Sequence, residues 1–229
     1  MESISHLFNV LWAPAATMFK VAKHKKVLAP LILLTAGGIL SVVVTFNQIN
    51  MGEVMLRTLE QQGRAPSGEQ RDRMLAMMNG PAARAFGAIS AVVVPTVTVV
   101  FVAVIFFGLF TLLGREGGFK AFFAVTAFAF VPSIVRTAAA VLTMIVVPQS
   151  QLMLDELGNI GPAVMLDRSA VSSKVFAAAA QIDVVSLWIL ALLVIGYRFV
   201  TRKNVSVLAR TICVFGVWLV YVAFRVALA

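Results

Sequence analysis

The sequence predicts an all-α membrane protein, a polytopic transmembrane bundle of about five helices with an amphipathic helix at the membrane surface near its N-terminus. Hydrophobic residues make up 60% of the chain and charged residues 13%, which is more apolar than a soluble domain of this length can bury in one core. Five apolar runs are each long enough to cross a hydrocarbon layer of roughly 30 Å. The period-two alternation of a transmembrane β-barrel is absent, so the spans are predicted to be helices.

Residues 1–26 are predicted to form a cytoplasmic segment that begins with the amphipathic helix. Its apolar residues recur at i, i+3, i+4, i+7 and i+8, namely Ile4, Leu7, Phe8, Leu11 and Trp12. Such a single stripe is typical of a helix that lies in the membrane interface. The alternative is that the stripe packs against the protein's own helices.

The basic sequence KHKK follows the stripe at 23–26, directly before the first apolar run. Lys23, Lys25 and Lys26 are therefore expected to contact headgroups, above all those of anionic lipids. The charges of this segment follow its apolar positions instead of preceding them, so we expect no cleavable signal peptide.

The predicted spans and connections together make a single membrane domain over residues 1–229. The spans cover residues 27–46, 86–113, 121–147, 175–200 and 205–228. Residues 47–85 and 148–174 form two long external connections, and helical spacing of apolar residues predicts a short helix after residue 50. A four-span alternative places the run at 175–200 on the membrane surface.

The distribution of Lys and Arg predicts the orientation, because basic residues gather on the cytoplasmic side of a membrane. One side collects ten basic residues against the acidic Glu2 and Glu116, whereas on the other side basic and acidic residues balance. The ten are Lys20, Lys23, Lys25, Lys26, Arg115, Lys120, Arg198, Arg202, Lys203 and Arg210. We therefore expect a cytoplasmic N-terminus and an external, periplasmic C-terminus in a bacterial inner membrane.

Three charged residues lie inside the apolar runs and are predicted to form an intramembrane polar cluster. Arg136, Asp183 and Arg225 each lie 15 or 16 residues from a basic residue at the cytoplasmic end of the same run. At 1.5 Å per residue, all three reach about the same depth, about 22–24 Å from that end. Since an unpaired charge there is costly, Arg136 is expected to pair with Asp183, with Arg225 close by or extended outward. The pair is either a structural staple or a site for an anionic headgroup or solute.

Two prolines fall at mid-depth in neighbouring spans. Pro95 and Pro132 each remove a backbone donor, so a helix kink is predicted at both positions.

The residues that catalysis or metal binding would need are missing from the spans. The only histidines are His6 and His24, and the only cysteine is Cys213. No metalloprotease, nucleophile-elbow or phosphate-loop motif occurs. We therefore predict no enzyme, no catalytic or metal-binding residue and no cofactor. Nucleic-acid binding is excluded because the basic residues are scattered between apolar runs.

Four stretches of the sequence resemble the Yip1 family of five-span membrane proteins in its short prokaryotic form. They are WAPAATMF at 12–19, KKVLAPLILL at 25–34, GREGGFKAFFAVTAFAFVPSIV at 114–135 and SLWILALLVIGYRFVTRKNVSVLARTICV at 186–214. The resemblance implies five spans, a cytoplasmic N-terminus, an outward C-terminus and a non-enzymatic role in membrane organisation or trafficking.

The resemblance also bears on the partners. Eukaryotic members act with small GTPases and have a long cytosolic N-terminal region with tyrosine-glycine motifs. Here the only tyrosines are Tyr197 and Tyr221, which weighs against a GTPase partner.

Two functional hypotheses follow. In the first, the protein shapes or organises the membrane, or is a scaffold for membrane-protein partners. In the second, it is a small transporter, channel or accessory subunit of a transport system that handles an anionic lipid or solute near Arg136. Small residues, among them Gly37, Gly38 and the alanines at 177–180, also permit self-association.

Overall fold

A computed structural model describes residues 2–61, 63–64, 66–148, 157–166, 170–203 and 205–228. Within these ranges the protein is helical, and the only β-type pairing is an isolated bridge between Arg115 and Thr201. The prediction of an all-α bundle is therefore confirmed. Part of the connection predicted at 148–174, residues 149–156 and 167–169, lies outside the described residues.

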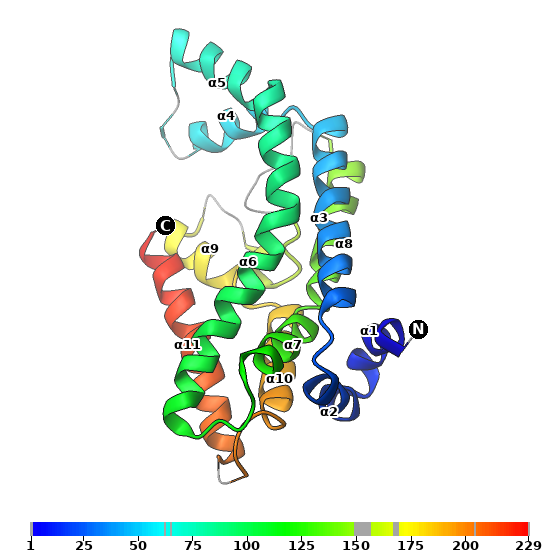
Figure 1. Cartoon of the computed structure of the whole chain (residues 1–229). Coiled ribbons are helices and arrows are strands. Elements are labelled where there is room, and N and C mark those ends of the chain that lie inside the picture. The colour runs from blue at the N-terminus through cyan, green and yellow to red at the C-terminus, as the bar shows by residue number, and fades with distance from the viewer. Residues whose placement is uncertain are drawn as a thin grey trace.

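Figure 1 shows the helices in their arrangement along an elongated molecule. In chain order they are α1 Glu2–Trp12, α2 Pro14–His24, α3 Leu28–Gln48, α4 Met51–Gln61, α5 Glu69–Asn79, α6 Pro81–Leu113, α7 Phe119–Ala129, α8 Ser133–Val146, the 3₁₀ helix Pro162–Met165, α9 Ser173–Ala179, α10 Val184–Tyr197 and α11 Val207–Ala227. The α4–α5 hairpin lies at one end of the molecule. At the other end α6 and α10 finish, and α7 and α11 begin.

Four segments of the described chain are long and apolar enough to cross a membrane. They are Leu28–Gln48, Pro81–Leu113, Phe119–Val146 and Val207–Ala227. A fifth candidate is the pair α9 and α10, whose axes differ by 52° across a short break. The run predicted at 175–200 is thus not one continuous helix, because the backbone of Asp183 is extended and a new helix starts after it.

The helix α6 is longer than any bilayer requires. Its 33 residues correspond to about 50 Å, against roughly 30 Å of hydrocarbon. The helix joins α5 at Gly80. The α4–α5 hairpin is held by Asn50 and Asn79, whose side chains bond at 2.7 Å. The short helix predicted after residue 50 is present as α4.

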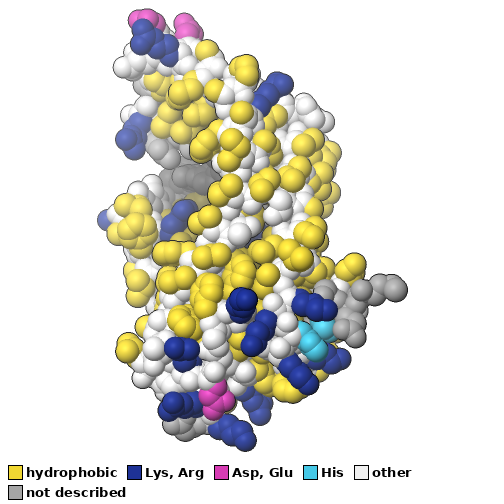
Figure 2. All heavy atoms as spheres, viewed as in Figure 1, with side chains coloured by type: hydrophobic (Ala, Val, Ile, Leu, Met, Phe, Trp, Pro, Cys, Tyr) yellow, Lys and Arg dark blue, Asp and Glu magenta, His cyan; other side chains and the backbone are white. Residues whose placement is uncertain are grey.

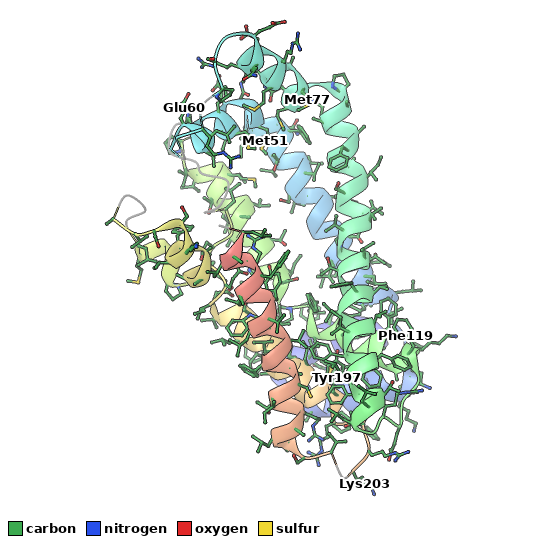
Figure 3. The ribbon with its side chains drawn as sticks, turned by 90° about the vertical axis from the view of Figure 1, so that its left-hand side faces the viewer. Met51, Glu60, Met77, Phe119, Tyr197 and Lys203 are labelled. Atoms are coloured by element: carbon green, nitrogen blue, oxygen red, sulfur yellow. The ribbon has the colours of Figure 1, made fainter. Side chains whose placement is uncertain are left out.

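The main core lies at the end of the molecule opposite the hairpin and is built from aromatic rings. Tyr197 of α10 contacts the rings of Phe106, Phe110 and Phe122 at centroid distances of 5.0–5.4 Å. Helix α7 passes through this core, with eight of its eleven residues buried. Figure 3 shows Tyr197 among the side chains that α6, α7 and α10 bring together.

The α3, α6 and α8 helices pack through small residues instead. A Cβ added to Gly38 of α3 would lie 2.9 Å from the carbonyl oxygen of Ala91 in α6, so the two backbones are nearly in contact. Gly37 instead leaves room for the side chain of Ile134 in α8, which a Cβ at position 37 would overlap. From the sequence alone, these glycines permit self-association. In the structure they form helix contacts within one chain.

Large apolar side chains cover much of the outer surface along the spans, as Figure 2 shows in yellow. Phe86, Leu112 and Val220 are among those that are mostly exposed. A surface of this kind requires an apolar solvent, which the bilayer provides.

Candidate functional site

Arg136 projects from the first turns of α8, just after a break in the third span. Helix α7 ends at Ala129, and a turn follows in which Val131 N–H donates to Phe128 and Ser133 N–H donates to Phe130. Pro132 has no N–H to give and occupies the N-cap position of α8. The sequence predicts a kink at Pro132, and at this position a short turn separates α7 from α8 within the third candidate span.

Asp183 is positioned by a second break, between α9 and α10. It is the N-cap residue of α10, where its Oδ1 accepts a hydrogen bond of 2.8 Å from the backbone N–H of Ser186. Its Oδ2 accepts a second bond of 2.9 Å from the Ser186 hydroxyl. A carboxylate at this position is stabilised by the free N–H groups and the dipole of the helix.

The two breaks bring Arg136 and Asp183 into contact. Arg136 Nη2 lies 2.6 Å from Asp183 Oδ2 and 2.9 Å from the Ser186 hydroxyl oxygen. The Asp183 side chain is 4% exposed, whereas that of Arg136 is 39% exposed. The carboxylate is thus enclosed and both of its oxygens accept hydrogen bonds, while the Arg136 side chain stays partly exposed. The arrangement joins α8 to α10 and neutralises the carboxylate inside the membrane.

Arg136 also borders an open groove between α3, α6 and α8. The groove encloses about 420 Å³, and a neighbouring cavity of about 200 Å³ shares Gly38, Val94, Pro95 and Thr137 with it. Its wall combines apolar residues with the hydroxyl groups of Ser41, Ser90 and Thr137. Close to the site, Gly158 has a φ of +71° and approaches the backbone of Arg136 so closely that a Cβ would meet its carbonyl oxygen. We name this feature the Arg136 groove.

Arg225, the third residue predicted for the cluster, is not joined to this pair. Arg225 is exposed near the end of α11, and no hydrogen bond or ion pair joins it to Arg136 or Asp183 among the described residues. Pro95 lies inside α6 and lines the groove.

The amphipathic stripe near the N-terminus divides between two environments. Ile4, Phe8 and Trp12 of α1 are exposed, with Trp12 at 85%. Leu7 and Leu11 pack against the main core, and Val10, which the predicted stripe does not include, is completely buried. One side of α1 therefore attaches the helix to the bundle, and the other side remains apolar and open.

The predicted headgroup contacts are exposed and lie at the start of the first span. Lys23 belongs to the last turn of α2, and Lys25 caps that helix in the left-handed conformation, with a φ of 55°. Lys26 follows it at the surface. The rest of α2 is not a free basic segment, because Met18 and Val21 are buried in the main core.

Sequence patterns gave no indication of the buried polar contact between α7 and α10. The hydroxyl groups of Thr126 and Tyr197 lie 2.9 Å apart, and both side chains are fully buried. The two residues are 71 positions apart, so no local spacing could have paired them. By contrast, Asp183 and Ser186 have the spacing of a helix N-cap and its third residue, which would have predicted the start of α10.

In the part of the chain that the structure describes, no group of three or more His, Cys, Asp and Glu side chains could hold a metal ion.

Comparison with curated proteins and with solved structures gives no match. A family model, the Yip1 domain, matches residues 8–228. With nearly its whole length matched and with four to five apolar helices that can cross a bilayer, the chain is an integral membrane protein that belongs to the Yip1 domain family.

Proposed function

We propose that this protein has no enzymatic activity and organises or shapes the membrane around it, with α1 as the element that enters one leaflet. The observation that carries the proposal is the division of α1. Leu7, Val10 and Leu11 hold it on the bundle, while Ile4, Phe8 and Trp12 point away from the core and are exposed.

The position of α1 fits an interfacial helix. It adjoins α2, whose last turn carries the exposed Lys23 just before the first span. Apolar side chains on a helix in the interface replace lipid volume near the headgroups, and basic residues beside them attract anionic lipids. Because α1 is attached to a bundle that crosses the bilayer, the insertion would be restricted to one leaflet, which favours curvature.

The charge distribution supports a cytoplasmic location for this end, in a bacterial inner membrane, with five spans and an external C-terminus. On the other side, the α4–α5 hairpin offers a surface for membrane-protein partners. A GTPase partner is not part of the proposal.

Vesicle shape tests the proposal. The full chain would be incorporated into vesicles of phosphatidylcholine and phosphatidylglycerol, and vesicle diameters measured by electron cryomicroscopy. We expect the wild type to narrow the vesicles and the variant Phe8→Glu/Trp12→Glu to lose the effect, since both positions are exposed on α1. The control variant Asn9→Glu/Ala16→Glu places the same charge on exposed positions outside the stripe and should retain it. Equal vesicle diameters for all three proteins and for protein-free vesicles would refute the proposal.

The Arg136 groove favours a second candidate function, the passage of an anionic lipid or solute past Arg136. The groove is bordered by the partly exposed side chain of Arg136 and by hydroxyl groups at a depth where lipid alone would offer no polar partners. In this candidate the protein is a small transporter or an accessory subunit of a transport system.

Transfer of a fluorescent phosphatidylglycerol between leaflets tests the second candidate. Transfer should fall in Arg136→Gln and be retained in Arg225→Gln, which removes the same charge outside the groove. The partner variant should be Asp183→Asn, because asparagine can still cap α10. A charge swap would be uninformative, since an arginine at position 183 cannot accept the N–H of Ser186. Transfer that survives both Arg136→Gln and Asp183→Asn would exclude the candidate.

A further inference from the structure

The two connections at the end of the molecule opposite the hairpin are joined through their backbones. Arg202 N–H donates to Gly114 at 2.9 Å, and the N–H groups of Glu116 and Gly117 both donate to Val200, at 3.0 and 2.9 Å. The bridge between Arg115 and Thr201 is part of the same contact. The turn after α6 and the turn after α10 therefore form one structural unit, and their arginines have fixed positions relative to each other.

This unit contains a cavity of about 440 Å³ with an arginine from each turn in its wall. The lining residues are Thr111, Leu112, Leu113, Gly114, Arg115 and Arg202. The guanidinium carbon of Arg115 lies 4.5 Å from the centre of the Phe107 ring, and its Nη1 donates to the carbonyl of Gly117 at 3.4 Å. These contacts hold the Arg115 side chain in place and leave other guanidinium N–H groups for a ligand.

The positive charge at this end has no acidic partner within the described chain. Six basic residues gather here, namely Arg115, Lys120, Arg198, Arg202, Lys203 and Arg210. Glu116 is the single acidic residue nearby in the sequence, and no ion pair among the described residues involves any of the six. Figure 2 shows dark blue side chains over this end of the molecule, and Figure 3 places Lys203 at its tip.

Arg210 adds a buried positive charge to this end of the molecule. Its side chain is 6% exposed and donates from Nη1 to the carbonyl of Val205 at 2.7 Å, while its Nε has no partner among the described residues. Val205 N–H donates in turn to the carbonyl of Arg202. A permanent positive charge is thus fixed behind the turn that carries Arg202. Without an anion it would raise the electrostatic free energy of this end.

The surroundings of the cavity fit an amphiphilic anion. Leu112, at 86% exposed, and Leu113 line the cavity and belong to the last turn of a helix long and apolar enough to cross a membrane. The cavity therefore lies where a span meets the headgroup layer, with arginines on the polar side and leucines on the side toward the lipid chains. Two guanidinium groups bind a phosphate through several charge-assisted hydrogen bonds.

From this geometry we propose that Arg115 and Arg202 bind a phosphate group, that of an anionic phospholipid in the adjoining leaflet, while Leu112 and Leu113 contact its acyl chains. The site is separate from α1 and from the Arg136 groove, so it does not depend on either function proposed above.

Native mass spectrometry of the full chain in detergent, titrated with phosphatidylglycerol, tests the assignment. Arg115→Gln/Arg202→Gln should weaken lipid binding about tenfold or more, because it removes charge-assisted bonds to the phosphate. Lys120→Gln/Lys203→Gln removes the same charge at this end but leaves the cavity lining intact, and it should change binding less than about twofold. Equal binding by both variants would overturn the proposal.

A lysine variant and a competition with inorganic phosphate complete the test. Arg115→Lys/Arg202→Lys retains the charge and loses the forked geometry, so it should bind with intermediate strength even if the glutamine variant fails to fold. Inorganic phosphate serves as the competitor. We expect it to leave phosphatidylglycerol bound, because it lacks acyl chains. Displacement of the lipid by equimolar phosphate would show a site for the soluble anion and would overturn the lipid assignment.

Discussion

The two halves of the bundle are held together in different ways. Around Tyr197, α2, α6, α7 and α10 enclose a continuous core of large rings, in which α7 is almost completely buried. Around Arg136, α3, α6 and α8 meet through glycine and alanine, bury few large side chains and leave a groove. The first half is thus a densely packed base, whereas the helices of the second half depend on close backbone contact. The ion pair of Arg136 and Asp183 joins this second half to α10 of the base.

This difference explains the place of the polar groups. In the base, the Thr126 and Tyr197 hydroxyl groups satisfy each other and leave no charge. In the open half, Asp183 is enclosed but Arg136 keeps an accessible surface. A ligand needs polar groups that it can reach. We therefore expect binding at the Arg136 groove and at the ends of the molecule, and not inside the base.

The largest loss of stability is expected from a larger side chain inside the packed core around Tyr197, the base. A Cβ at Gly196 of α10 would overlap Val125 of α7 and lie 3.2 Å from the sulfur of Met18 in α2. Gly196→Val should therefore lower the free energy of unfolding by about 3 kcal/mol, measured by reversible unfolding in mixed micelles. Gly216→Val is the matched control, because no atom lies within 4 Å of a Cβ there. Equal losses in the two variants would mean that α7 and α10 are not in close contact.

Loss of the ion pair should have the next largest effect. Asp183→Ala leaves Arg136 without its partner and α10 without its cap, and we expect a loss of about 2 kcal/mol, moderated by the exposure of Arg136. Asp183→Asn keeps the cap and should recover about 1 kcal/mol of that loss. Unfolding in the same mixed micelles separates the two contributions. Alanine and asparagine variants of equal stability would contradict the capping role.

The buried hydroxyl pair should contribute less. Tyr197→Phe removes one partner of Thr126, whose hydroxyl also donates to the Phe122 carbonyl, so the unfolding free energy should fall by about 1 kcal/mol. Tyr221→Phe, at an exposed position of α11, should leave it unchanged. A Tyr197 variant as stable as the wild type would show that this contact does not stabilise the base.

The smallest effect on stability is expected at the exposed side of α1. Phe8→Glu/Trp12→Glu should change the unfolding free energy by less than about 0.5 kcal/mol, whereas Leu7→Glu/Leu11→Glu should destabilise the base, because those leucines pack against the main core. Similar unfolding midpoints for the two double variants would mean that α1 has no attached side.

The features that could be predicted from the sequence are those that depend on the composition or spacing of residues within one short stretch. The apolar runs and the stripe of α1 each follow from spacing or composition. Counting along two spans led to the expectation that Arg136 pairs with Asp183, and the two side chains are in contact. The division of the stripe did not follow, because spacing shows which residues share a face but not whether lipid or protein covers it. Val10 is the clearest case, since it lies beside the stripe and is completely buried.

Other features depend on contacts between distant segments. The basic residues at the end of α2 predicted headgroup contacts, and the burial of Met18 in the main core could not be inferred from them. The cavity between Arg115 and Arg202 exists only because two turns far apart in the sequence are joined through Gly114 and Val200. The break before α10 did have a local signal, in the spacing of Asp183 and Ser186.

The depth of Trp12 in a bilayer tests most directly the claim that α1 lies in the membrane interface. Trp188→Phe/Trp218→Phe leaves Trp12 as the single tryptophan, and its fluorescence can be measured in vesicles with bromine at defined positions on the lipid chains. We predict strong quenching by bromine close to the headgroups and weak quenching by bromine near the chain ends. Absence of quenching at every bromine position would place Trp12 in water and contradict the account.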